Sequence, residues 1–427
     1  MMSPAVISLL ILALCVVLFL TEWIPNWVTG CLGCALMVLF GVCSFEDAFS
    51  GFSNSIVVLM IGAMVVGAAM FETGAAQIIG RKVISLSGGN SRTFLLIGSI
   101  VAGVLAMFLA NTAVLAAFLP IIDSVCRTTP QMKRKDLALP IACSVMFGGA
   151  CTLIGCTPQL TANGIMEEMT GLQMGMWDLT APGVCLLVIF IVYTQVFGYR
   201  LGQKIWGDRP DSAMDLEEEK VASVMNTNFD QKKMALMFLI VVLMIISYAT
   251  AWISTAMTAV SAGLLCIVTG CCKPKTALRE INWDCVLFLG ACLGIANGLT
   301  ESGAGELIGQ GVAALLGEVN SPMVIFAVLV LMTLLISQFI TNSTAIIIML
   351  PIGLSLCSVY GFSYLPFCLG ITFGASVACC TPLAAAQIAM TQVAGYQFSD
   401  YLRYTWPMTI LSYLGILIFV PLFYPLV

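Results

Sequence analysis

The sequence predicts an all-α polytopic membrane protein built from an inverted repeat. About ten transmembrane spans are expected, two of them broken, together with two re-entrant hairpins. Three observations lead to this fold class. Of the 427 residues, 60% are hydrophobic and only 9% are charged, whereas about a quarter of a soluble domain is charged. Four apolar runs are too long for one span, and several motifs occur once in each half of the chain.

The apolar runs give the order of the elements. They fall roughly at residues 5–20, 27–43, 55–71, 93–125, 137–170, 181–198, 234–253, 255–272, 283–300, 322–359, 362–394 and 406–425. A helical span needs about 20 residues, so the runs at 93–125, 137–170, 322–359 and 362–394 must each fold back or break. The first run lacks a basic leader and a small-residue cleavage site, and we therefore expect it to be a retained span.

Basic residues orient the first hairpin, 93–125. The cations that flank it are Arg81, Lys82, Arg92, Arg127, Lys133, Arg134 and Lys135. Because positive charge concentrates on the cytoplasmic side, both ends of this hairpin should lie inside, with Asn111 at its turn. No Lys or Arg occurs between Arg279 and Arg403, so the hairpin 322–359 should enter from outside. Both chain termini are then expected outside.

Three pairs of motifs indicate the duplication. GAMVVGAAMFETGA parallels GACLGIANGLTESGA, LANTAVLAAFLP parallels ITNSTAIIIMLP, and GCTPQL parallels CCTPLA. We expect a first repeat at residues 1–198, an acidic cytoplasmic linker at 199–233, and a second repeat at 234–427. The linker charges are expected to be solvated, although partner binding stays open. Inverted repeats of this kind are typical of secondary transporters.

The breaks LANTA, GCTPQ, ITNST and CCTPL place polar residues inside apolar runs. Non-helical backbone at membrane depth is tolerated only where protein buries it or a watery cavity receives it, so four symmetric breaks imply one shared cavity. Helix N-termini suit an anion, and exposed carbonyls suit Na⁺. No Lys or Arg lies within a predicted span or hairpin, so helix termini and bound cations would have to attract an anion.

The composition argues against an enzyme and a resident cofactor, and no nucleic-acid partner is expected. The chain has no His, its 18 cysteines are scattered, and its net charge is −5. A zinc site without His would need four converging thiolates, and the breaks contain no carboxylate. A proton-coupled antiporter usually places a carboxylate at the midplane, whereas Glu72 and Glu301 form a repeat-related pair near span ends.

The sequence resembles the divalent anion/sodium symporters, the INDY-like di- and tricarboxylate carriers of the ion transporter superfamily. The two hairpin motifs resemble the Ser-Asn-Thr signatures of that family. WIPNWVTG, SFEDAFSGFSNSIVVLMIGAM, GGACTLIGCTPQLTANGI and GYQFSDYLRYTWP extend the likeness over nearly the whole chain. The resemblance implies a multi-pass protein of the plasma (inner) membrane, a homodimer in the lipid bilayer, and a mobile transport domain that moves like an elevator against a scaffold.

The resemblance also implies two sets of site residues. The residues expected to bind a small anionic substrate are Asn111, Thr112, Thr157, Pro158, Asn342, Ser343, Thr381 and Pro382. Those expected around two coupling Na⁺ ions are Ala106, Ala110, Asn111, Cys156, Ser337, Ile340, Thr341, Asn342 and Cys380.

The chain departs from the family pattern at both sets. The first Ser of the signature is Ala110 here and Thr341 in the repeat, and five residues before each Asn stand Ala106 and Ser337. Either backbone carbonyls near Ala106 and Cys156 replace the lost hydroxyls, or the chain uses fewer Na⁺ ions, or it exchanges anions. The Pro and Asn that follow Thr-Pro in the family are replaced by Gln159-Leu160 and Leu383-Ala384.

These features together predict a secondary active transporter of a small di- or tricarboxylate such as succinate or citrate, coupled to Na⁺. The alternatives are an anion exchanger, a sulfate carrier, and a proton or cation antiporter or arsenite-efflux type of the same superfamily. Two further patterns are not predicted to contribute to the site. Gly290, Gly294 and Gly298 predict close helix packing, and Gln387, which follows the second break, is given no role.

Overall fold

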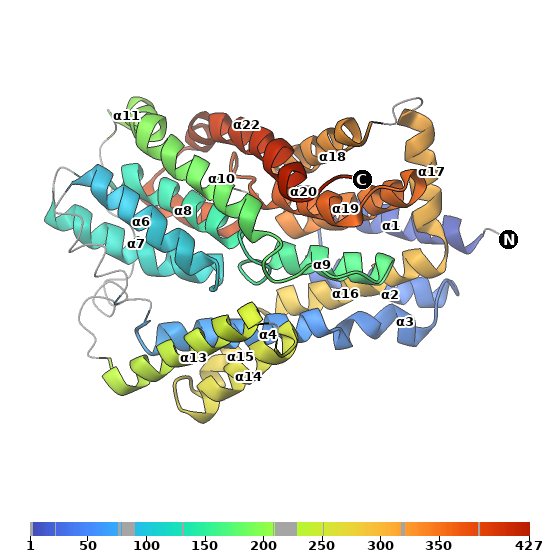
Figure 1. Ribbon diagram of the computed structural model, residues 1–427, viewed down its shortest axis with the longest axis horizontal. Coiled ribbons are helices and arrows are strands. Elements are labelled where there is room, and N and C mark those ends of the chain that lie inside the picture. Colours follow the sequence, from blue (N-terminus) through green and yellow to red (C-terminus); the bar gives the residue numbers. More distant parts are fainter. Residues whose placement is uncertain are drawn as a thin grey trace.

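Helices form every regular element in the part of the chain that the computed structural model describes. The described residues are 3–427 without 22, 76–77, 79–89, 130–131, 208, 210–228, 251, 317–320 and 383–384. Six of the helices there are long and apolar enough to cross a membrane. The predicted all-α polytopic fold class is therefore confirmed (Figure 1).

The helices follow the predicted order in both halves. In the first half they are α1 (Pro4–Thr21), α2 (Asn26–Leu39), α3 (Phe45–Phe49), α4 (Ser55–Glu72), α6 (Ser91–Ala106), α7 (Asn111–Thr128), α8 (Arg134–Gly149), α9 (Thr157–Thr170), α10 (Thr180–Tyr193) and α11 (Tyr199–Trp206). In the second they are α13 (Gln231–Thr250), α14 (Thr255–Val268), α15 (Pro274–Glu280), α16 (Trp283–Glu301), α17 (Ala304–Leu316), α18 (Pro322–Ile336), α19 (Asn342–Tyr360), α20 (Tyr364–Ser376), α21 (Ala386–Ala389) and α22 (Phe398–Phe423).

The two long runs predicted as hairpins are helix pairs, α6 with α7 and α18 with α19, and each second helix begins at the Asn of its motif. The two broken runs are α8 with α9 and α20 with α21. Three differences from the expected boundaries appear. A π-helical turn at 194–198 joins α10 to α11, so the range 199–233 begins as helix. The last helix starts at Phe398 rather than at 406, and the short helices α3, α15 and α17 were not predicted.

Several residues on which the sequence predictions depend lie outside the described residues. They are Arg81 and Lys82, most of the predicted linker (208 and 210–228), and the Leu383-Ala384 pair.

Helices from the two halves pack against each other. Helix α2 packs on α16, α4 on α14, and α9 contacts α16, α19 and α20. In Figure 1, α4, α13, α14 and α15 lie along the lower edge, while α6, α8, α10 and α11 lie at the upper left. Helix α9 runs between these groups, so the first broken helix sits at the centre of the molecule.

The predicted close packing at the glycines of α16 is confirmed. A Cβ at Gly294 would lie 1.8 Å from the Ala48 carbonyl oxygen, and one at Gly298 would lie 2.3 Å from the sulfur of Met37. Gly290 likewise meets the Phe52 ring, at 2.8 Å from a Cβ. Glycine is needed at these positions because α16 approaches the backbone of the α2–α3 region more closely than any side chain permits.

Buried ion pairs fix the ends of the first hairpin. Asp123 near the end of α7 is fully buried and accepts hydrogen bonds of 2.6 Å from Nε of Arg127 and from Nε of Arg134. Arg209 donates at 2.6 Å to the buried Asp400 at the start of α22. Charged side chains are rarely buried unless paired, so these pairs tie the feet of α7 to α8, and the residues after α11 to α22.

We predict that Gly294→Ala destabilises the protein, because the new methyl group collides with the Ala48 carbonyl. Overpacking of this kind costs about 1–3 kcal/mol. The measurement is the thermal unfolding midpoint of the purified protein in detergent. The matched control is Gly311→Ala in α17, where a Cβ meets nothing within 4 Å. Equal midpoints for the two variants would contradict the packing interpretation.

Candidate functional site

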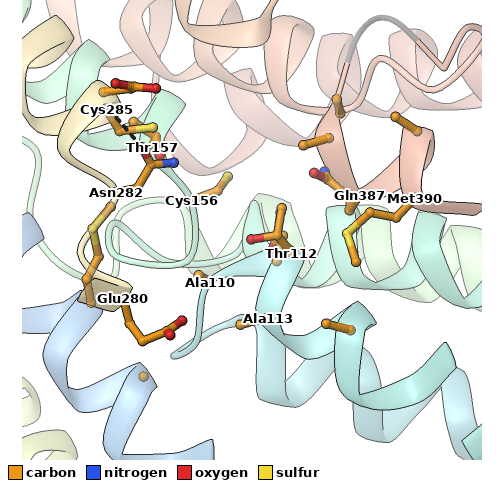
Figure 2. A pocket seen from close by; sticks show the side chains of 18 of the residues that line it. Ala110, Thr112, Ala113, Cys156, Thr157, Glu280, Asn282, Cys285, Gln387 and Met390 are labelled. Atoms are coloured by element: carbon orange, nitrogen blue, oxygen red, sulfur yellow. Dashed lines mark hydrogen bonds between the residues drawn. The ribbon is translucent and has the colours of Figure 1, made fainter. Parts of the chain in front are cut away.

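The helix breaks meet at one cavity of about 1520 Å³. The predicted substrate residues on its wall are Asn111, Thr112, Thr157, Pro158, Asn342, Ser343 and Pro382, and the predicted cation residues there are Ala110, Asn111, Cys156, Thr341 and Asn342. The structure therefore brings together polar residues that are separated by more than 200 positions in the sequence. Figure 2 shows the tip of the first hairpin in the cavity, between the Gln387–Met390 wall and a wall with Glu280, Asn282 and Cys285.

Thr381 takes a different position from its supposed counterpart Thr157. Thr157 begins α9 at the cavity, whereas Thr381 donates its hydroxyl hydrogen bond to the carbonyl of Gln338, and α21 begins only at Ala386. The Gln338 side chain also accepts the N–H of Cys380 at 2.8 Å. Thr381 and Cys380 thus anchor the second break to the second hairpin and are not among the described residues that line the cavity.

The first half has an equivalent hydrogen bond to its hairpin, but a different residue donates it. The hydroxyl of Thr152 donates to the carbonyl of Met107, and Met107 stands four residues before Asn111, as Gln338 stands four before Asn342. Thr152 is therefore the structural counterpart of Thr381. The Thr-Pro motifs, although alike in sequence, are used differently in the two halves.

The second hairpin tip holds three oxygen atoms close together. The hydroxyl of Ser337 lies 3.0 Å from Oδ1 of Asn342 and 2.8 Å from the carbonyl oxygen of Ala375. Ser337 and Asn342 are more than nine-tenths buried, and Ile340 between them is also buried. A hydroxyl, an amide oxygen and a backbone carbonyl are oxygen groups of the kind that coordinate Na⁺ in transporters.

The first hairpin tip lacks this arrangement. Ala106 and Ala110 supply no hydroxyl, and Oδ1 of Asn111 is buried without a donor among the described residues. The amide of Asn111 rests on Gly149, where a Cβ would lie 2.2 Å from Oδ1. At the second tip, Asn342 is held near Ala375, which carries a methyl group where Gly149 has none. The two tips are related by sequence but differ in how their Asn is held.

The cavity wall carries no Lys or Arg among the described residues. Positive potential comes instead from the N-termini of α7, α9 and α19, whose first N–H groups have no partner within their own helix. Neither α7 nor α9 has a side-chain cap, and α19 is capped by Thr341 on the N–H of Thr344 alone. Helix starts of this kind are the usual backbone sites for an anion.

Carboxylates also line the cavity. Glu72 ends α4, Glu280 ends α15, and Asp284 lies in the first turn of α16. On α7 the lining continues from Ala110 to Pro120, toward the foot of the hairpin. The sequence did not indicate these carboxylates as cavity residues, because only the packing of α4, α15 and α16 brings them to this wall. Gln387, which was not predicted as a site residue, also lines the cavity.

Known proteins resemble the chain as follows. A family model described as citrate transporter (CitMHS) matches residues 16–331 and 319–426. The uncharacterized transporter sll0640 of Synechocystis sp. is 30% identical over 190 residues, 44% of this chain and 31% of that protein. The chain thus matches under a third of that relative's length.

Two further likenesses extend over most of the chain. The sodium-dependent dicarboxylate transporter SdcS of Staphylococcus saprophyticus is 22% identical over 366 residues, 78% of this chain and 69% of that protein. The crystal structure of the Alcanivorax borkumensis YdaH transporter has a TM-score of 0.64 at 12% identity, covering 88% of this chain and 86% of that one. This last likeness concerns the fold alone.

We predict that Gly149→Ala prevents ligand binding, because the methyl group would occupy the place of the Asn111 amide. The measurement is the thermal stabilisation by citrate in the presence of Na⁺, which should disappear. Asn111→Ala added to Gly149→Ala should raise the ligand-free unfolding midpoint above that of Gly149→Ala alone, since the collision is then removed. Citrate stabilisation of Gly149→Ala equal to that of the wild type would refute the role of this contact.

Proposed function

The chain belongs to the citrate transporter family, and we propose that it is a secondary active transporter of small di- or tricarboxylates, coupled to Na⁺. The observation that carries the proposal is the single cavity on which three helix N-termini converge without a fixed cation on its wall. A divalent anion needs several donors, and backbone N–H groups at helix starts supply them.

The two hairpin tips would hold the substrate between them. Each tip offers an Asn amide, whose NH₂ group donates, and a hydroxyl next to it, on Thr112 or Ser343. Hydrogen bonds from these groups to a carboxylate are charge-assisted and stronger than neutral ones. Two such donor groups on opposite sides suit a ligand with two or more carboxylates.

The second tip would hold the coupling Na⁺. Two further oxygens, Oδ1 of Asn342 and the carbonyl of Ala375, lie within hydrogen-bond distance of the Ser337 hydroxyl. A bound cation there would add positive charge beside the start of α19, which favours the anion in turn. The relative SdcS is named a sodium-dependent dicarboxylate transporter, which supports the same coupling for this chain.

The cavity extends toward one end of the first hairpin, and this supports a state that is open to the cytoplasm. Its lining runs from the two tips along α7 toward the end of the hairpin at which Arg127 and Arg134 are paired with Asp123. Positive charge marks that end as cytoplasmic. An elevator-type movement of the hairpins and broken helices against the helices of the α4 and α16 regions, in a homodimer, would carry the site to the other side.

We predict that the protein in proteoliposomes takes up labelled citrate or succinate when a Na⁺ gradient is present, and more slowly without it. Labelled sulfate serves as the test of the sulfate alternative. Uptake that is independent of Na⁺ but requires an anion inside the proteoliposome would show that the protein is an anion exchanger and not a Na⁺ symporter. No uptake of any of the three anions under any gradient would refute the proposed function.

We predict that Asn111→Ala and Asn342→Ala each abolish uptake in folded protein, since each removes one side of the anion site. Ser337→Ala should instead raise the Na⁺ concentration for half-maximal uptake about tenfold, the cost of about one hydrogen bond. Ser412→Ala is the matched control, because its buried hydroxyl donates to the Met408 carbonyl away from the cavity. Normal uptake by either Asn variant would show that the two-tip site is wrong.

A further inference from the structure

A hydrogen-bonded bridge joins the two broken helices at the cavity wall. Gln159 in α9 is fully buried, and its side chain contacts Cys156 of the first half and Ser376 of the second. The thiol of Cys156 lies 2.6 Å from Oε1 of Gln159, and Nε2 of Gln159 lies 3.3 Å from Oγ of Ser376. Cys156 and Ser376 both line the cavity, whereas Gln159 lies behind them.

The direction of the hydrogen bonds in this bridge follows from the chemistry of its members. A protonated thiol offers a donor, so its partner on Gln159 must be the carbonyl oxygen Oε1. The amide NH₂ group of Gln159 is then turned toward Ser376, and only donates. Oγ of Ser376 therefore accepts this hydrogen bond and keeps its own proton for another acceptor.

Besides this bond, the Ser376 hydroxyl also contacts the sulfur of Cys156, which as a thiol is only a weak acceptor. Ser376 ends α20 and is almost completely buried, with its open side at the cavity. A carboxylate ligand in the cavity would supply a much stronger acceptor for the Ser376 proton than the thiol sulfur does.

The serine donor of this bridge occurs in the second half only. Ser376 stands three residues after Phe373, and the residue three positions after the equivalent Phe147 is Ala150. Gln159 follows Thr157-Pro158 directly, and it is one of the residues at which the chain departs from the family pattern. The donor therefore distinguishes the two sides of the cavity in a way that the paired Asn residues do not.

We propose that Ser376 is a substrate-binding residue that donates a hydrogen bond to a substrate carboxylate, and that Gln159 is the positioning residue that turns the Ser376 proton toward the cavity. This proposal rests on the proposed function, which it deepens by adding a carboxylate contact from the second broken helix. Gln159 acts only through Ser376 and does not touch the substrate.

The test is the kinetics of labelled citrate uptake by the full chain in proteoliposomes under a Na⁺ gradient. Ser376→Ala should raise KM about tenfold, the effect of losing one hydrogen bond to a charged acceptor, while the maximal rate changes less than twofold. Ser376→Thr keeps the hydroxyl and should restore most of the affinity. Ser412→Ala removes a buried hydroxyl that donates to the Met408 carbonyl and does not line the cavity, and it should leave the wild-type KM unchanged.

A double-mutant cycle isolates the role of Gln159. Gln159→Leu alone should raise KM in the same direction, but in the Ser376→Ala background it should change KM less than twofold. Independent effects that multiply would overturn the positioning role, and a wild-type KM in Ser376→Ala would overturn the whole inference while leaving the proposed function intact. If the wild-type chain takes up no citrate, succinate or sulfate, both proposals are overturned together.

Should Gln159→Leu fail to fold, as judged by its unfolding midpoint, Gln159→Glu replaces it. Burial favours the neutral form of a carboxyl group, so this variant is measured at high pH, where the ionised carboxylate can only accept and would draw the Ser376 proton away from the cavity. The same rise in KM is then expected, and an unchanged KM would overturn the positioning role.

Discussion

Inside a membrane, a backbone N–H group that is not hydrogen-bonded to protein must face water or a ligand. This constraint applies at three helix starts, Asn111, Thr157 and Asn342, where the N–H groups of the first turn have no partner within the helix and the residues line one cavity. Their N–H groups supply the positive potential that Lys and Arg supply in many soluble anion sites. The packing of α16 against α2 and α3, and the ion pairs around Asp123, hold these starts in place.

The two repeats have diverged at the residues that hold the tips. Ser337 bonds the Asn342 side chain, whereas Asn111 rests on Gly149 with its oxygen unpaired among the described residues. An unpaired buried acceptor costs about 1–3 kcal/mol. The second tip is thus held by protein groups before any ligand binds, and the first gains more when a ligand or cation reaches it. This difference offers a physical basis for unequal roles of two related half-sites.

Much of the fold could be predicted from the sequence, because hydrophobic run length, basic residues and duplicated motifs are local signals. The hairpins begin and end within a few residues of their predicted bounds, and both Asn residues start a helix. The displacement of Thr381 from the cavity, the Gln159–Ser376 bridge and the lining carboxylates could not be predicted. Each depends on a contact between segments far apart in the chain, for which one sequence contains no spacing rule.

The central claim is that the cavity binds an anion only together with a cation, since its wall has no fixed positive side chain. Equilibrium binding of labelled citrate to the purified protein, titrated with Na⁺ and with choline as the replacement cation, tests this most directly. We expect the affinity for citrate to rise with Na⁺ concentration, and we expect citrate to raise the affinity for Na⁺ by the same factor, as linkage requires. Citrate binding of equal strength with and without Na⁺ would contradict it.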